Sequence, residues 1–154
     1  MLISLIFDGD IMEKDMEKAI SLLTGEVTCA LCREDVVLTA TARGVRPLLL
    51  WLDSGVCTRG FSAADRVVGR GAAFLYRLLG VKAVYARVMS EPAAQVLRAG
   101  GIAAYPLKLV PGIINRAGDG PCPFEAAVLS IEDPQEALTA IRTKMKALSL
   151  QKDG

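Results

Sequence analysis

Among the four cysteines, Cys122 lies in the sequence context that most favours a reactive thiol, because it precedes Pro123 in the string GDGPCPFEAAVL. Proline suits the first position of a helix, so Cys122 is expected near an N-cap, where helix N–H groups can stabilise a thiolate. Glu125, three residues later, could act as an acid–base partner or simply close the cap. The chain has no histidine, which excludes a Cys–His nucleophile. A catalytic and a structural Cys122 both remain open.

Ser90 and Glu91 form a second polar group, at the join between the β-branched run VYARVM and the helical segment EPAAQVLRA. Ser90 suits the N-cap of that helix and Glu91 its first turn, each stabilising it by about 1 kcal/mol or less. The same join lies at the carboxyl end of a predicted strand, where ligands of α/β sheets gather. We therefore interpret both residues as helix-start residues that can also contact a ligand.

Asp65 is the third candidate, in the string SAADRVVGRGAAFLYRLLG over residues 62–80. Ser62 as N-cap and Gly80 as stop predict one helix over this whole string. Asp65 would then either cap the helix or accept hydrogen bonds from N–H or hydroxyl groups of a ligand. Gly69 and Gly71 weaken a helix by about 1 kcal/mol each, which indicates close approach by another backbone or by a ligand.

The remaining candidates are a loop asparagine and a cysteine pair. Asn115 lies in the glycine-rich loop 111–123, where with Arg116 it could hold a nucleobase edge, a carboxylate or a phosphate, or merely face solvent. Cys29 and Cys32 spell C-x-x-C, but on a strand this offset places the two side chains on opposite faces. We interpret them as core residues, and Cys57 as an incidental loop thiol.

The elements that must position these residues alternate between helices and strands. Helices are predicted over 14–24, 46–55, 62–80 and 91–99, with a last one from Asp133 to about Leu148. Strands are predicted over 26–32 and 36–42, forming a hairpin around Arg33-Glu34-Asp35, and over 81–88 and 102–110, the last interrupted or ended by Pro106. This order predicts an α/β fold, a three-layer α/β/α sandwich with a mixed sheet.

Composition limits the partners. The chain has 154 residues, 52% of them hydrophobic, which fits a single domain over 1–154, with residues 1–11 as a peripheral segment. Its net charge of +1, without long single-sign runs, argues against nucleic acid and membrane surfaces as partners. The apolar start MLISLIF is too short for a membrane span or a signal peptide, so a cytoplasmic protein with reduced cysteines is expected.

The order of elements resembles the cytidine-deaminase-like superfamily, whose zinc site reads H-x-E at the start of one core helix and P-C-x-x-C at the start of the next. On this chain AAD (63–65) takes the place of the first motif and PAAQV (92–96) that of the second. More closely, the chain resembles a bacterial family in that superfamily, domain of unknown function 1893, over residues 25–140. The strings that carry this likeness are GVRPLL, AADRVVGRGAAFLY, VYARVMSEPA, GIINRAGDGPCPFEAAVL and IEDP.

The departures from the superfamily pattern concern the metal. Ala63, Ala93 and Val96 stand where the resemblance implies the three zinc ligands, and Asp65 stands in place of the acid–base glutamate. Neither a metal nor a cofactor is therefore expected.

Three functions remain. The leading hypothesis is a metal-free domain that binds a small, nucleotide-like molecule in the ancestral pocket. The residues proposed to contact it are Asp65, Ser90, Glu91, Asn115 and Glu125. The second is an enzyme with Cys122 as nucleophile and Asp65 or Glu125 as proton carrier. The third is a protein-interaction module that uses the sheet edge or the last helix, with homo-oligomers possible.

Overall fold

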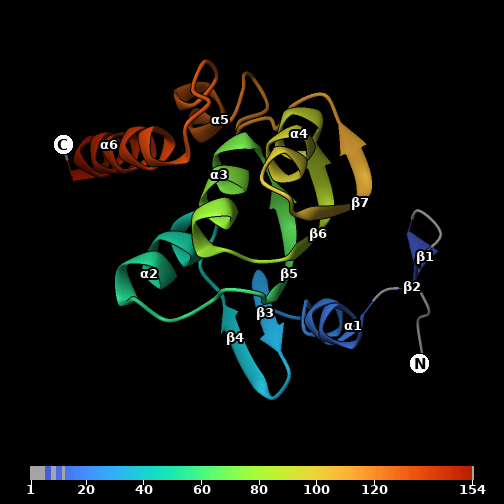
Figure 1. Ribbon diagram of the computed structural model, residues 1–154. Coiled ribbons are helices and arrows are strands. Elements are labelled where there is room, and N and C mark those ends of the chain that lie inside the picture. Colours follow the sequence, from blue (N-terminus) through green and yellow to red (C-terminus); the bar gives the residue numbers. More distant parts are fainter. Residues whose placement is uncertain (1–5, 8–9, 12, 154) are drawn as a thin grey trace.

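The computed structural model describes residues 6–7, 10–11 and 13–153. Ile6–Phe7 (β1) and Asp10–Ile11 (β2) pair as a two-stranded antiparallel sheet, separate from the main sheet. In Figure 1 this small sheet lies on the opposite side of the molecule from the end of the last helix. Most of the opening MLISLIF, residues 1–5, lies outside the described residues.

Five strands form the main sheet, in the order β4-β3-β5-β6-β7. β5, β6 and β7 run parallel, whereas β3 pairs antiparallel with both β4 and β5, so the sheet is mixed as predicted. The strands span Cys29–Arg33 (β3), Val36–Ala40 (β4), Ser62–Val68 (β5), Ala83–Ser90 (β6) and Ala103–Val110 (β7). The helices span Lys14–Ser21 (α1), Arg46–Ser54 (α2), Arg70–Leu79 (α3), Glu91–Ala99 (α4), Pro123–Ala127 (α5) and Pro134–Asp153 (α6).

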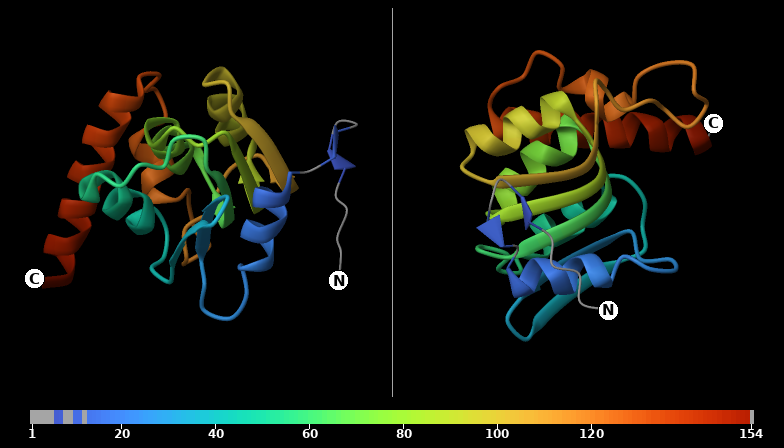
Figure 2. Two further views of the ribbon diagram at one scale, coloured as in Figure 1. Left: turned by 60° about the horizontal axis from the view of Figure 1, so that its bottom comes forward. Right: turned by 90° about the vertical axis from the view of Figure 1, so that its right-hand side faces the viewer.

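The helices cover the two faces of the sheet unequally. α1 packs on one face, against β3 and β5, and its cluster includes Met16, Ala30 and Ala64. α3 and α4 pack on the other face, with α2, α5 and α6 against α3 (Figure 2). The predicted three-layer arrangement is therefore confirmed. Within the described ranges no helix combines the length and the apolar character needed to cross a membrane.

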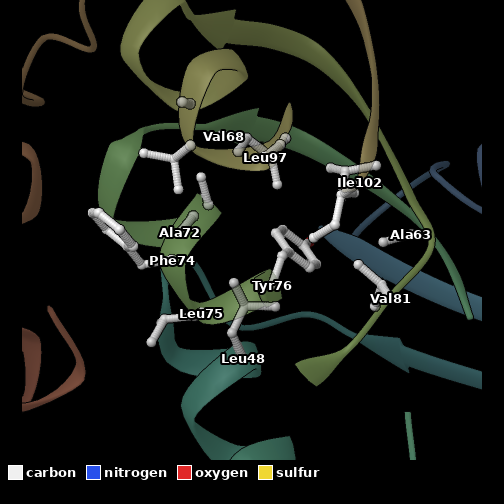
Figure 3. Packing of buried hydrophobic residues seen from close by; sticks show 14 of the residues in the cluster. Leu48, Ala63, Val68, Ala72, Phe74, Leu75, Tyr76, Val81, Leu97 and Ile102 are labelled. Carbon is white, nitrogen blue, oxygen red and sulfur yellow. The ribbon is translucent and has the colours of Figure 1, made fainter. Parts of the chain in front are cut away.

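α3 is the centre of the larger core. Eight of its ten residues are buried, and Phe74, Leu75 and Tyr76 are completely so. Figure 3 shows these side chains with Leu48 of α2 and Leu97 of α4 around them. A helix buried nearly all round behaves as a fixed support, so the residues at its start are held firmly in position.

The prediction of one helix over residues 62–80 is wrong. Residues 62–68 form the central strand β5, and the helix begins only at Arg70, after an extended Gly69. The central strand is covered on both faces, so it shows no alternation of polar and apolar residues. Ala63 and Ala64 are both 0% exposed, one in each core cluster, and such small residues fit beneath closely packed helices. Ser62 therefore caps no helix.

Two other expectations differ in detail. β7 runs through Pro106 without a break, with Pro106 in register with Ala86. β7 is an edge strand, where a missing N–H can face away from the sheet. α6 extends to Asp153, beyond the expected end near Leu148. The hairpin, by contrast, turns at Glu34 and Asp35 as predicted, with Glu34 at φ 53°.

Candidate functional site

The carboxyl ends of β5 and β6 lead directly into α3 and α4 (Figure 1), so two helix starts meet at one end of the sheet. Ser90 is completely buried there, and its Oγ accepts a hydrogen bond of 3.1 Å from the N–H of Ala93. The predicted N-cap is therefore confirmed. Glu91, in the first turn of α4, is exposed to solvent at the same end.

Glu125 supplies the cap that α3 lacks in its own sequence. Its Oε2 accepts a hydrogen bond of 2.9 Å from the backbone N–H of Arg70, the first residue of α3. A carboxylate at this position is stabilised by the helix dipole. The other oxygen, Oε1, is buried and has no hydrogen-bond partner in the described part of the chain. Glu125 thus caps a helix remote in sequence, not the helix that begins after Cys122.

Gly69 and Gly71 are explained by the approach of α5. A Cβ added at Gly69 would lie 2.7 Å from Glu125 Oε1, and one added at Gly71 would lie 3.3 Å from the carbonyl oxygen of Phe124. A side chain at Gly69 would displace the Glu125 carboxylate, and one at Gly71 would press on the backbone of α5. The expected close approach of another backbone is confirmed at Gly71, whereas at Gly69 the approaching group is the side chain of Glu125.

Arg70 anchors the chain that follows α5, a role that was not predicted from the sequence. The residue is buried, its Nε donates to the carbonyl of Val128 at 3.0 Å, and its Nη2 donates to the carbonyl of Ile131. Nη2 also lies 3.1 Å from Oε1 of Glu132, and the guanidinium stacks 5.1 Å from the centre of the Phe74 ring. An arginine between two glycines at a helix start was the available signal.

Cys122 and Asn115 lie in the loop that brings Glu125 into place. Cys122 is the N-cap of α5, as predicted, and its backbone N–H donates to the carbonyl of Ile113 at 2.9 Å. Its side chain is half-buried and makes no capping hydrogen bond. Asn115 Oδ1 accepts from the N–H of Gly118 at 2.8 Å, and its Nδ2 donates to Asp119 at 2.9 Å. Asn115 therefore organises its own loop in this structure.

Asp65 lies inside the core, between β5 and α3. Tyr76 donates a 2.6 Å hydrogen bond from its hydroxyl to Asp65 Oδ2, and the Cys29 thiol lies 3.1 Å from the same hydroxyl. Burial raises the pKa of the Asp65 carboxyl to about 6, although hydrogen bonds from Tyr76 and from two backbone amides oppose the rise. Burial also raises the pKa of the Cys29 thiol and of the Tyr76 phenol, and the nearby Asp65 adds to both.

The structure thus separates the predicted residues Glu125, Ser90 and Glu91, which lie at the two helix starts, from Asp65, which lies in the core. Glu125 meets the start of α3 directly, and Ser90 and Glu91 form the start of α4. The Asp65 carboxyl is hydrogen-bonded to the side chains of Tyr76 and Cys29 and to two backbone amides, and not to Cys122 or Glu125, among the residues described. Placing AAD at a helix start was an error, since residues 63–65 lie within β5 and the helix begins with Arg70.

The cysteine pair behaves as the offset predicted. Cys29 belongs to the cluster beneath α3 and Cys32 to the cluster beneath α1, so the two side chains lie on opposite faces of β3. In the ranges that the structure covers, no three cysteine or acidic side chains come close enough to hold a metal ion.

Comparisons with solved structures show which proteins this fold is similar to. A crystal structure of a DUF1893 family protein (TM1506) from Thermotoga maritima aligns with a TM-score of 0.77 and 22% identity, covering 86% of this chain and 92% of that one. The dCMP deaminase of cyanophage S-TIM5, in apo form, aligns with a TM-score of 0.42 and 16% identity, covering 62% of this chain and 99% of that one.

The sequence comparisons give one further result. Among curated proteins no significant match is found. The family model described as TM1506, domain of unknown function (DUF1893), matches residues 18–145, which is most of the chain. The protein therefore belongs to the DUF1893 family.

Proposed function

We propose that this protein binds a small, uncharged, nucleoside-like molecule at the carboxyl ends of β5 and β6, beside the starts of α3 and α4. The observation that carries the proposal is Oε1 of Glu125, a buried carboxylate oxygen without a donor. A buried acceptor left unsatisfied costs about 1–3 kcal/mol, and more when it is charged. A ligand that donates an N–H or O–H group to this oxygen would recover that energy on binding.

The charges at this end of the sheet favour a donor-bearing, uncharged ligand over a phosphate. Glu91 and Glu125 both carry carboxylates at these helix starts, and a phosphate brought near them would be repelled. The one guanidinium at the start of α3, that of Arg70, is already bonded to two carbonyls and to Glu132. The amide and amino edges of a nucleobase are uncharged and supply the N–H donors that Glu125 lacks.

Access requires movement of α5. The helix has only five residues and each of them is at least partly exposed to solvent, although the Oε1 atom of Glu125 is itself buried. It is held at the start of α3 by the bond from Arg70 to Glu125 and, just beyond it, by the bonds from the Arg70 guanidinium. Segments with few buried apolar contacts open locally at low cost. A ligand can therefore reach Glu125 by lifting α5 while α3 and the sheet stay in place.

Cysteine chemistry is less well supported. A proton carrier would have to exchange protons with the Cys122 thiol, but among the described residues no hydrogen bond joins this thiol to either of the two carboxylates considered for that role. Glu125 accepts from Arg70, and Asp65 accepts from Tyr76. We therefore give binding precedence over catalysis.

The test compares nucleosides with their monophosphates by isothermal titration calorimetry, using the wild type, Glu125→Gln and the matched control Glu136→Gln. Gln keeps one oxygen for the Arg70 N–H but replaces the other with an NH₂ donor, so its nucleoside affinity should fall at least tenfold. Glu136 is exposed at the start of α6, and its variant should bind like the wild type. Equal binding by Glu125→Gln, or no heat from any nucleoside, would contradict the proposal.

A further inference from the structure

A second hollow lies at the opposite end of the parallel strands, on the face covered by α1. Its floor contains Ser62, Ala83 and Ala103, the first residues of β5, β6 and β7, which lie in register beside one another. Three small side chains in one row leave space under the start of α1. The hollow has a volume of about 360 Å³, within the range of small-molecule sites.

Ser62 is the unexplained group in this hollow. The residue is 1% exposed, and its Oγ has no hydrogen-bond partner anywhere in the ranges described. A buried hydroxyl is nearly always bonded, so an unpartnered one lining a cavity indicates a missing partner. This serine plays no part in the site at the carboxyl ends of the strands.

The rim of the hollow carries both charges. Lys82 forms an ion pair with Glu13, and its Nζ lies 4.0 Å from Oδ2 of Asp15. The side chains of Lys82 and Glu13 are 41% and 64% exposed, so both can turn toward a ligand without leaving a buried charge. Met16, which is buried in the first turn of α1, forms an apolar wall of the hollow.

We propose that this hollow binds a small zwitterion with a polar side chain, of the class of free amino acids that carry a hydroxyl or an amide. Its carboxylate pairs with Lys82, its ammonium pairs with Glu13, and its side chain reaches the hydroxyl of Ser62. An ion with a single charge can pair with only one of Lys82 and Glu13, and it leaves the other side chain without a new partner. The site is separate from the one proposed above and does not depend on it.

The test is a ¹H–¹⁵N NMR titration of the full chain with L-asparagine, L-alanine, acetate and methylamine. Asparagine should shift the amides of Ser62, Lys82, Ala83 and Ala103 saturably, at least tenfold more tightly than alanine. Acetate and methylamine should need higher concentrations still. No shift at these amides with asparagine, or equal affinity for asparagine and acetate, would overturn the proposal.

Variants separate the hydroxyl from the charges. Ser62→Ala removes a group with no partner, so the variant should fold, lose at least tenfold in affinity for asparagine and keep its affinity for alanine. Lys82→Gln should weaken both amino acids, and Ser149→Ala, on α6, is the matched control for the serine change. If Ser62→Ala binds asparagine as the wild type does, the assignment of the hydroxyl is wrong.

Discussion

Asp65→Asn should change how stability depends on pH, because burial in the core disfavours the ionised form of the Asp65 carboxyl. Its pKa rises from 3.8 in the unfolded chain to about 6 in the folded protein. The protonated Asp65 carboxyl contributes its full stabilisation below pH 3.8, and this stabilisation is lost as the pH rises through 6. At about 1.4 kcal/mol for each pKa unit, the loss is about 3 kcal/mol by pH 7.5.

Urea unfolding of the wild type and of Asp65→Asn at several pH values between 3.5 and 8 measures this directly. Asn keeps the shape and an oxygen for the Tyr76 hydroxyl, but it does not ionise. The free energy of unfolding of the variant, relative to the wild type, should therefore rise by about 3 kcal/mol from the acidic to the alkaline end.

The matched control is Asp53→Asn on α2, where the carboxylate forms a surface ion pair with Arg142. Both side chains of that pair are about half exposed, so its removal should change stability little at any pH. Parallel stability curves for Asp65→Asn and the wild type would refute the burial argument, as would a rise confined to pH values above 7.

Two further predictions concern the contact of α5 and the thiols. Gly69→Ala should lower the free energy of unfolding by about 1–2 kcal/mol, because the added Cβ displaces Glu125. Glu125→Ala introduced into this variant should lower it little further, because both changes break the same contact. Additive losses in a double-mutant cycle would contradict this. The exposed Cys57 should react first with iodoacetamide. The buried Cys29 and Cys32, whose pKa values are raised, should react only on unfolding. Labelling of Cys29 at the rate of Cys57, measured by peptide mass spectrometry, would be inconsistent with the core described.

The sequence predicts those elements whose signals are local. Ser90 caps α4, Gly55 ends α2 in a left-handed conformation, and the hairpin turns where its charged residues stand. β5 was missed because burial on both faces removes the alternating pattern, and because Ser62 and Asp65 imitate a capping box at the three-residue spacing of a helix start. The physical reason is that tertiary burial outweighs local propensity at the centre of a sheet.

The candidate site was predictable only in part. Glu125 was singled out for its place after Cys122, but its partner, the N–H of Arg70, is 55 residues away in sequence. The bond between Asp65 and Tyr76 requires the strand and the helix to be placed correctly first. Contacts of this kind depend on tertiary packing, and no spacing within one element indicates them.

The most direct test of the central claim follows the backbone amide of Arg70 during a nucleoside titration by ¹H–¹⁵N NMR. This N–H donates to Glu125, so it reports any change at that carboxylate. We predict a saturable shift of the Arg70 resonance, together with those of Gly71 and Phe124 at the contact with α5. Arg70 resonances that stay unchanged at millimolar nucleoside would contradict the account.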